Sequence, residues 1–402
     1  MSMQPNQREA QVRVSSLFSR CGAIAAVAFC TSAAPADDAP ERAAAPDHVS
    51  ITWLSVTNIY YELGPLHVLT DGYITRIPRT EFFGGGGGYA FTHHPHTPDA
   101  AAVTRVMNAL GGARSVDLLF TGHSHWDHSF DTATWAKLTG APILGSKTTC
   151  LEAIAQGIPV ERCQALYGGE TIELSPGVIV RVVRWNHSGD LNNPEQHNPV
   201  ELCNQPQLDA ESGGLHAGVA EDFPNGGGNR AYLFTVDGPQ GRYSWFYQNS
   251  ASPADLNVSI IVEGTDYGAP LENLKTAMRE AELDHVDLWI GTGGLAVAQL
   301  VAPVVKPRAY LPVHWDDFFA PFEAGVTKPF ADPALEKFLA EGKIKLIRPD
   351  QYMDRWRLDV NGIASEPNDD AQRALGFAKS ARAPSRDKQA DATLASNCSA
   401  PR

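Results

Sequence analysis

The segment His123–His128, which reads His-Ser-His-Trp-Asp-His, constrains the fold of this chain more than any other feature. It directly follows VDLLFTG (116–122), a run with the length and continuous apolar character of a strand covered on both faces. Such a strand needs another layer of structure on each side. The segment that carries the histidines therefore starts at the end of a buried strand, and the fold is expected to be of the α/β class.

The rest of the chain alternates between strand-like and helix-like segments, as this class requires. Strands are predicted at 49–56, 67–72, 116–122, 141–146, 178–185, 231–238, 242–248, 258–264, 286–291 and 308–314, with two short ones ending near Val360. Helices are predicted at 98–110, 130–140, 271–283, 296–305 and 333–342.

The two ends of the chain differ in composition from its middle. Residues 1–36 carry arginines before an uncharged apolar stretch and a small-residue site, the pattern of a signal peptide and too short for a membrane span. Residues 37–48 read as a linker, 49–360 as one folded domain, and 361–402 as a disordered tail. The sequence thus predicts a periplasmic or secreted protein whose mature chain has no integral membrane span.

A long polar segment rich in Gly, Asn and Pro occupies 186–229 inside this domain. It exceeds the usual length of a connection without regular structure, so either a lid over the site or a mobile surface insertion is expected.

Charge and cysteine content limit the partners and the chemistry. The formal net charge is −14 and no basic patch is visible, which argues against a nucleic-acid partner. The expected partner is instead a small-molecule or lipid-like substrate, as the residues described below indicate. Removal of 1–36 would leave Cys150, Cys163, Cys203 and Cys398, none of them in a CxxC pair. Cys150 with Cys163 is the local disulfide candidate, but three pairings are open. The sequence does not predict the oligomeric state.

The histidine segment has the composition of a metal site. His123 and His125, at i and i+2 of an extended chain, point the same way, and Asp127 and His128 follow where the chain turns towards a helix. Imidazoles with a carboxylate suit Zn²⁺, with Mn²⁺ or iron as alternatives. Two further histidines also follow predicted strands, His187 after 178–185 and His314 after 308–313.

Aromatic residues flank these ligands and either form an apolar wall or only pack the loops: Trp126, Trp185, Trp315, Phe318 and Phe319.

An HxHxDH motif after a buried strand, followed by two distant strand-end histidines, resembles the metallo-β-lactamase superfamily over about residues 50–360. The phrases GHSHWDH, LTGAPILGS and PVHWDDF look closest to the branch of ascorbate-phosphate lactonases and N-acylphosphatidylethanolamine phospholipases. This resemblance implies a four-layer αββα sandwich with metals held by loops at one edge of the sheets.

The resemblance also implies roles for individual residues. His123, His125 and His187 would hold one metal ion, and Asp127, His128 and His314 a second. Water between the ions would be the nucleophile, with Asp127 as the catalytic residue that orients it and accepts its proton.

The chain departs from the family at one position. Relatives commonly carry a Gly-Asp after a central strand, and its carboxylate bridges the two metals, but here 242–248 is followed by Asn249 and Ser250. Either residue would be at most a weak ligand at the bridging position, so we expect one complete metal site before a second. The sequence therefore predicts an exported hydrolase of an ester, lactone or phosphodiester. The alternative is a non-catalytic periplasmic protein that binds a metal or ligand, with a degenerate second site.

Overall fold

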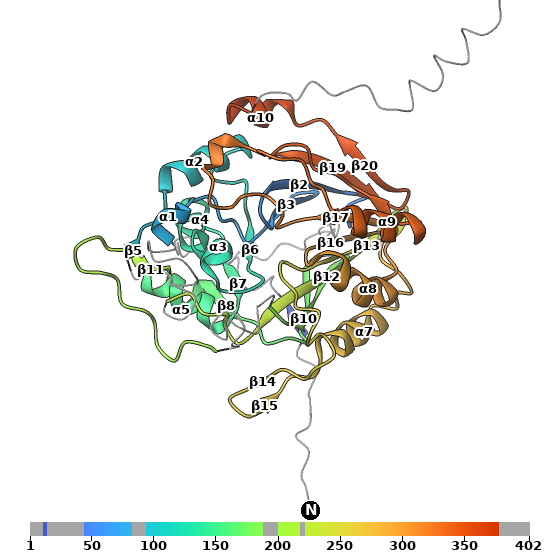
Figure 1. Cartoon of the computed structure of the whole chain (residues 1–402), viewed down its shortest axis with the longest axis horizontal. Helices are drawn as coiled ribbons and strands as arrows, with labels where there is room; N and C mark the ends of the chain where they lie inside the picture. The colour runs from blue at the N-terminus through green and yellow to red at the C-terminus, as the bar shows by residue number, and fades with distance from the viewer. Residues whose placement is uncertain (1–10, 14–43, 83–93, 188–199, 218–221, 378–402) are drawn as a thin grey trace, which may run out of the picture.

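Two eight-stranded sheets pack face to face in the computed structural model, with helices on both outer faces (Figure 1). The structure describes residues 11–13, 44–82, 94–187, 200–217 and 222–377. Most of the predicted signal peptide, the five glycines at 84–88 and the end of the predicted tail lie outside these ranges. Among the described helices, none has both the length and the apolar character needed to cross a bilayer.

The first sheet carries the histidine segment at the end of its strand β6. Its spatial order is β20 (Gly362–Glu366), β19 (Asp354–Asp359), β2 (Val49–Ser55), β3 (Asn58–Leu63), β4 (Leu66–Thr70), β6 (Leu118–Phe120), β7 (Ile143–Gly145) and β8 (Cys163–Ala165). Strands β2 to β4 form an antiparallel meander, whereas β4, β6, β7 and β8 run parallel. The parallel strands end at one edge of the sheet, where the loops after β4 and β6 meet.

The second sheet carries His187 and His314 on the loops that follow β10 and β17. Its spatial order is β1 (Gln11–Arg13), β9 (Thr171–Ser175), β10 (Val178–Trp185), β12 (Asn229–Gly238), β13 (Gly241–Tyr247), β16 (Leu288–Gly291), β17 (Ala309–Pro312) and β18 (Lys345–Leu346). Strand β1 lies within the segment predicted to be a signal peptide and pairs in parallel with β9.

Two short antiparallel pairs lie outside the sheets: β5 (Pro95–His96) with β11 (Leu215–His216), and β14 (Ile261–Val262) with β15 (Thr265–Asp266). The helices are α1 (Arg79–Phe82), α2 (Ala100–Ala109), α3 (Trp126–Ser129), α4 (Thr132–Thr139), α5 (Lys147–Ala155), α7 (Pro270–Glu280), α8 (Gly294–Val305), α9 (Pro333–Glu341) and α10 (Asp369–Ala374).

The hydrophobic core lies in layers between these elements. Aromatic side chains join the facing sheets, as where Tyr61 of β3 packs on Phe234 of β12 and Trp245 of β13 at 5.5 Å between ring centroids. Helices α2, α4 and α5 bury apolar side chains against the first sheet, and α7, α8 and α9 cover the second (Figure 1). This arrangement is the predicted four-layer αββα sandwich.

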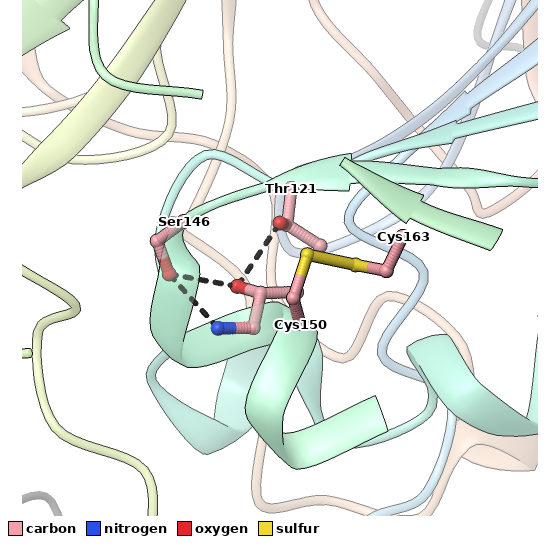
Figure 2. Close-up of a disulfide and its surroundings, with 5 residues drawn as sticks. Thr121, Ser146, Cys150 and Cys163 are labelled. Carbon is pink, nitrogen blue, oxygen red and sulfur yellow. Dashed lines mark hydrogen bonds between the residues drawn. A yellow bond between two sulfur atoms is a disulfide. The ribbon is translucent and has the colours of Figure 1, made fainter. Parts of the chain in front are cut away.

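A disulfide between Cys150 and Cys163 ties α5 to β8 (Figure 2). The hydroxyl group of Thr149 bonds to those of Thr121 and Ser146 beside it, and Ser146 also caps α5 by accepting a hydrogen bond from the amide of Thr149 at 2.9 Å. Of the pairings that the sequence left open, the structure thus forms the one between the two cysteines nearest in the chain. Cys203 is an exposed free thiol, and Cys398 lies outside the described residues.

Two predictions from the sequence were wrong in part. The strand predicted at 258–264 shrinks to β14, which joins neither large sheet, and Ile261 is 52% exposed. Its β-branched residues fit a pleated strand, but this propensity does not determine whether a segment reaches a sheet.

The tail predicted to be disordered from 361 instead contains β20 and α10, at 362–374. β20 is an edge strand with Ile363 as its one large apolar residue, too short to give a visible apolar period. Phe377 packs on Tyr352 and Phe322 in the core.

The polar segment at 186–229 contains one short strand, β11, among its described residues. Residues 188–199 and 218–221 lie outside the described ranges. Its role as a lid or as a surface insertion stays a prediction.

Candidate metal centre

The loops after β6 and β10 bring three histidines together, as the sequence predicted. Candidate ligand atoms of His123, His125 and His187 all lie within 4.8 Å of one another. His125 Nδ1 is 2.9 Å from His187 Nε2, and His123 is fully buried with Nε2 lacking any hydrogen-bond partner in the described chain. A buried imidazole nitrogen without a partner carries a desolvation cost that a bound cation would offset, so this group fits a metal ion.

A second group forms beside the first, from Asp127, His128 and His314. Asp127 Oδ2 lies 3.2 Å from His314 Nε2 and 3.6 Å from His128 Nε2. The rings of His123 and His128 are 4.1 Å apart between centroids, so the two groups are neighbours. All six predicted ligands therefore converge in two adjacent triads.

The local backbone explains how six residues supply four of these ligands. His125 has an extended backbone and is the N-cap of α3, with its carbonyl accepting the amides of His128 and Ser129 at 3.0 and 2.9 Å. Asp127 and His128 then occupy the short helix, which turns their side chains away from the first triad towards the second.

His314 occupies an unusual backbone conformation. Its φ of 63° is rare for a residue with a side chain and costs about 1–3 kcal/mol. The amide of His314 donates to the Val56 carbonyl at 2.9 Å, and Asp316 accepts the Val56 amide and the Tyr352 hydroxyl. These bonds to the β2–β3 turn hold the loop so that His314 faces Asp127.

A buried carboxylate behind the ligands, Asp71, was not singled out from the sequence. Asp71 follows β4, is 0% exposed, and accepts His128 Nδ1 at 3.0 Å. The same Oδ2 accepts the hydroxyl groups of Thr57 and Tyr247 at 2.7 and 2.8 Å, while Oδ1 accepts the Gly122 amide at 2.8 Å. Because Nδ1 of His128 is held as a donor, its Nε2 is left with a lone pair that faces Asp127.

Asn249 lies between the histidines of the two triads, on the side away from their Nε2 atoms. Its Oδ1 is 3.3 Å from His123 Nδ1 and accepts Asn229 Nδ2 at 2.6 Å. Its Nδ2 donates to Asp71 Oδ2 at 2.9 Å. Asn249 thus contacts the back of the imidazoles.

This placement depends on Gly122, where a Cβ atom would lie 2.1 Å from the Asn249 amide nitrogen. The next residue, Ser250, is buried, and its carbonyl accepts the indole N–H of Trp185 at 2.9 Å.

The protonation states of the first triad and of Asp127 suit metal binding. Burial lowers the pKa of His123 and of His187 well below 6.5, and that of His125 to about 4. Burial opposes ionisation of Asp127, but the imidazoles of His128 and His314 outweigh it and hold the pKa of Asp127 well below its usual range. Near pH 7 the first triad therefore offers neutral nitrogen donors, and Asp127 offers a carboxylate. Burial also acts to lower the pKa of His128, but the carboxylates of Asp127 and Asp71 outweigh it and raise that pKa above its usual value, so a cation there would displace a proton.

The aromatic residues near the ligands are mostly buried packing partners. Trp126 and Phe319 are 3% and 9% exposed and pack with Phe82 in one cluster. Phe318 lies against the edge of the His314 ring at 5.2 Å between centroids, and Trp315 stacks on Trp53. Trp185, in contrast, also lines a cavity beside His187.

The four-layer architecture, with HxHxDH at the end of a central strand and two strand-end histidines completing paired triads, defines the metallo-β-lactamase fold. No family model matches the chain. Among curated proteins, it is similar to a UPF0173 metal-dependent hydrolase of Pyrobaculum arsenaticum, with 30% identity over 146 residues, 36% of this chain and 54% of that protein. A second such hydrolase, of Pyrobaculum calidifontis, is 33% identical over 85 residues, 21% of this chain and 37% of that protein. The chain thus spans about half the length of the first relative and less of the second.

Solved structures are similar at low sequence identity. Igni18, a metallo hydrolase of Ignicoccus hospitalis, aligns with a TM-score of 0.42 and 13% identity over 80% of this chain and 99% of its own. The metallo-β-lactamase fold protein YhfI of Bacillus subtilis aligns with a TM-score of 0.41 and 12% identity over 77% and 99%.

Proposed function

We propose that the chain is an exported metal-dependent hydrolase that cleaves an ester, a lactone or a phosphodiester. The observation that carries this proposal is the convergence of two adjacent triads whose donor atoms fit divalent cations. The curated relatives are named metal-dependent hydrolases, which supports the same activity. The Cys150–Cys163 disulfide and the N-terminal pattern support export to an oxidising compartment.

The donor set favours Zn²⁺, with Mn²⁺ or iron as alternatives, because five imidazoles and one carboxylate are borderline ligands. When bound, such a cation lowers the pKa of water and polarises the bond to be cleaved. His123, His125 and His187 would hold one ion, and Asp127, His128 and His314 the other.

The chain itself contributes fixed charge and orientation. Asp127 is 8% exposed and is held as a carboxylate, so it orients attacking water through a charge-assisted hydrogen bond and takes up its proton as the bond is cleaved. Asp71 and Asn249 fix the ring orientations of His128 and His123 from behind, so that the ligand nitrogens need not reorganise during turnover.

A panel of chromogenic esters, lactones, phosphodiesters and cephalosporins, with and without a chelator, tests this function. We expect turnover of at least one class to be lost with chelator, restored by Zn²⁺, and abolished in His187→Gln. His285→Gln is the matched control, because His285 precedes β16 and contacts Asp284 and Asp287. Metal binding without chelator-sensitive turnover of any class would instead favour the non-catalytic alternative.

A further inference from the structure

A cavity of about 130 Å³ opens beside His187 and has no role in the metal chemistry described above. Its walls come from the end of β10, the chain before β12, Asp255, and residues 258–261, which lead into β14. His187 is thus shared between this cavity and the first triad. A group bound in the cavity would therefore lie next to the metal position.

The cavity wall is mainly apolar. Trp185, Val258, Ile260 and Ile261 contribute to it, and Val258 and Ile261 are 56% and 52% exposed. In the described chain, only Val160 among the large apolar side chains is more exposed than these two. Exposed apolar side chains gathered at the mouth of a pocket are typical of a ligand site.

The wall is held rigidly against the metal loop. Asn186, next to His187, donates to Asp255 Oδ1 at 2.5 Å and to the Ser252 carbonyl at 2.9 Å. The guanidinium of Arg184 lies 4.1 Å from the ring centroid of Tyr267, whose amide bonds to Ile260. Figure 1 shows the β14–β15 hairpin projecting from the body beyond this anchored base. The cavity is therefore preformed.

Two buried polar atoms of the cavity-lining residues have no hydrogen-bond partner in the described chain: Nδ1 of His187, whose ring belongs to the first triad, and Oδ1 of Asn225. Asn225 is 1% exposed, and its Oδ1 accepts no hydrogen bond from any residue within the described ranges. A buried acceptor left without a donor costs about 1–3 kcal/mol, which a ligand N–H or O–H would recover.

We propose that this cavity binds an apolar group of the substrate, of about six carbon atoms, and that Asn225 Oδ1 accepts a hydrogen bond from an adjacent N–H or O–H. The size follows because apolar cavities of about 150 Å³ bind benzene. This inference about the cavity rests on the proposed hydrolase function. It identifies the substrate as an ester or phosphodiester that carries a small aryl or short alkyl group beside a hydrogen-bond donor.

Binding of benzyl alcohol and toluene to the full chain, measured by NMR titration with and without Zn²⁺, tests the proposal without requiring turnover. We expect benzyl alcohol to bind about five-fold more tightly than toluene, because its hydroxyl group donates one additional hydrogen bond to Asn225 Oδ1. Ile260→Trp, which fills the cavity from a partly exposed position, should weaken both at least about ten-fold. Asn225→Leu should bind the two probes equally.

Val160→Trp is the matched control, since Val160 is 68% exposed and is not part of the cavity lining. A cavity-filling variant that binds both probes like the wild type, or a wild type that binds neither, overturns the cavity proposal. A preference for benzyl alcohol that survives Asn225→Leu overturns the assigned hydrogen bond. If the probes bind as expected but no ester or phosphodiester is hydrolysed, the cavity proposal stands and the hydrolase function fails.

Discussion

Replacement of Asp71 by Asn tests whether a carboxylate outside both triads controls metal binding. Four donors converge on Asp71 Oδ2: Thr57, Tyr247, Asn249 and His128. The two hydroxyl groups can rotate towards other partners, but the amide of Asn249 and the ring N–H of His128 cannot.

The expected loss of folding free energy is estimated from the hydrogen bonds that Asn249 and His128 donate to Asp71. A hydrogen bond to a buried charged group contributes about 1.5–3 kcal/mol. If the NH2 group of the new amide replaces Oδ2, both bonds are lost, at a cost of about 3–6 kcal/mol; if it replaces Oδ1, it faces the Gly122 amide and one such bond is lost, at a cost of about 1.5–3 kcal/mol. In the first case, His128 can relieve part of the cost by moving its proton from Nδ1 to Nε2, which leaves about 3 kcal/mol. In that tautomer the nitrogen that faces Asp127 carries a proton and no longer binds a metal.

Asp71→Asn should therefore weaken the second triad selectively. We expect a loss of about 10–100-fold in its Zn²⁺ affinity, the usual effect of removing an outer carboxylate. The first triad should change little, because Asn229 still holds Asn249 Oδ1 beside His123. Chelator competition gives the two affinities, and urea unfolding gives the stability.

Asp131→Asn provides the matched control for a lost buried carboxylate. Asp131 is also 0% exposed and accepts the amides of Ile74 and Thr75, but it forms no hydrogen bond to a ligand histidine in the described chain. The control should lose stability yet bind two Zn²⁺ ions as the wild type does. If Asp71→Asn binds both ions with wild-type affinity, or loses affinity only as much as the control, the reasoning is refuted.

Three further predictions follow from the site and its support. Asn249→Asp would set a second carboxylate 2.9 Å from Asp71 Oδ2, so at neutral pH it should destabilise the chain by about 2 kcal/mol in urea unfolding; unchanged stability would contradict the observed contact. Reduction of Cys150–Cys163, or its replacement by two serines, should cost about 3 kcal/mol for a separation of 13 residues, measured as a lower Tm, and an unchanged Tm would argue against the bridge. Burial lowers the pKa of His125 from 6.5 to about 4, so in metal-free protein the unfolded chain gains a proton that the native state rejects. The stability from this residue should be complete above pH 6.5 and fall by about 3 kcal/mol as the pH drops towards 4, with a flatter profile in His125→Gln.

The six candidate ligands that the structure brings together could be singled out from the sequence because their signals are local. Four of them lie within six residues just after a strongly apolar strand: His123, His125, Asp127 and His128. His187 lies just after the end of another such strand. By contrast, β20 and the buried Phe377 gave no signal, because an edge strand with one large apolar residue gains its stability from a neighbour far away in the chain.

Asp71 shows why the outer part of the site could not be predicted. A lone Asp at the end of a strand is common, and nothing in its neighbours marks it as functional. Its role arises because β4 pairs with β6 and because β13 delivers Tyr247 from 176 residues away. The contacts that define it are all set by tertiary structure.

The same contacts give a physical reason why an amide, and not a carboxylate, occupies position 249. From the sequence, the missing acid left Asp127 as the only carboxylate to balance two divalent cations. The structure adds the buried negative charge of Asp71. This carboxylate accepts a hydrogen bond directly from His128, and it is connected to His123 through the side chain of Asn249. Because a neutral amide can donate to Asp71 and accept from His123 at once, Asn249 links both triads to one carboxylate, which a second acid at this position could not do without like-charge repulsion. The residue that departs from the family pattern is therefore the one that fits the charge of Asp71.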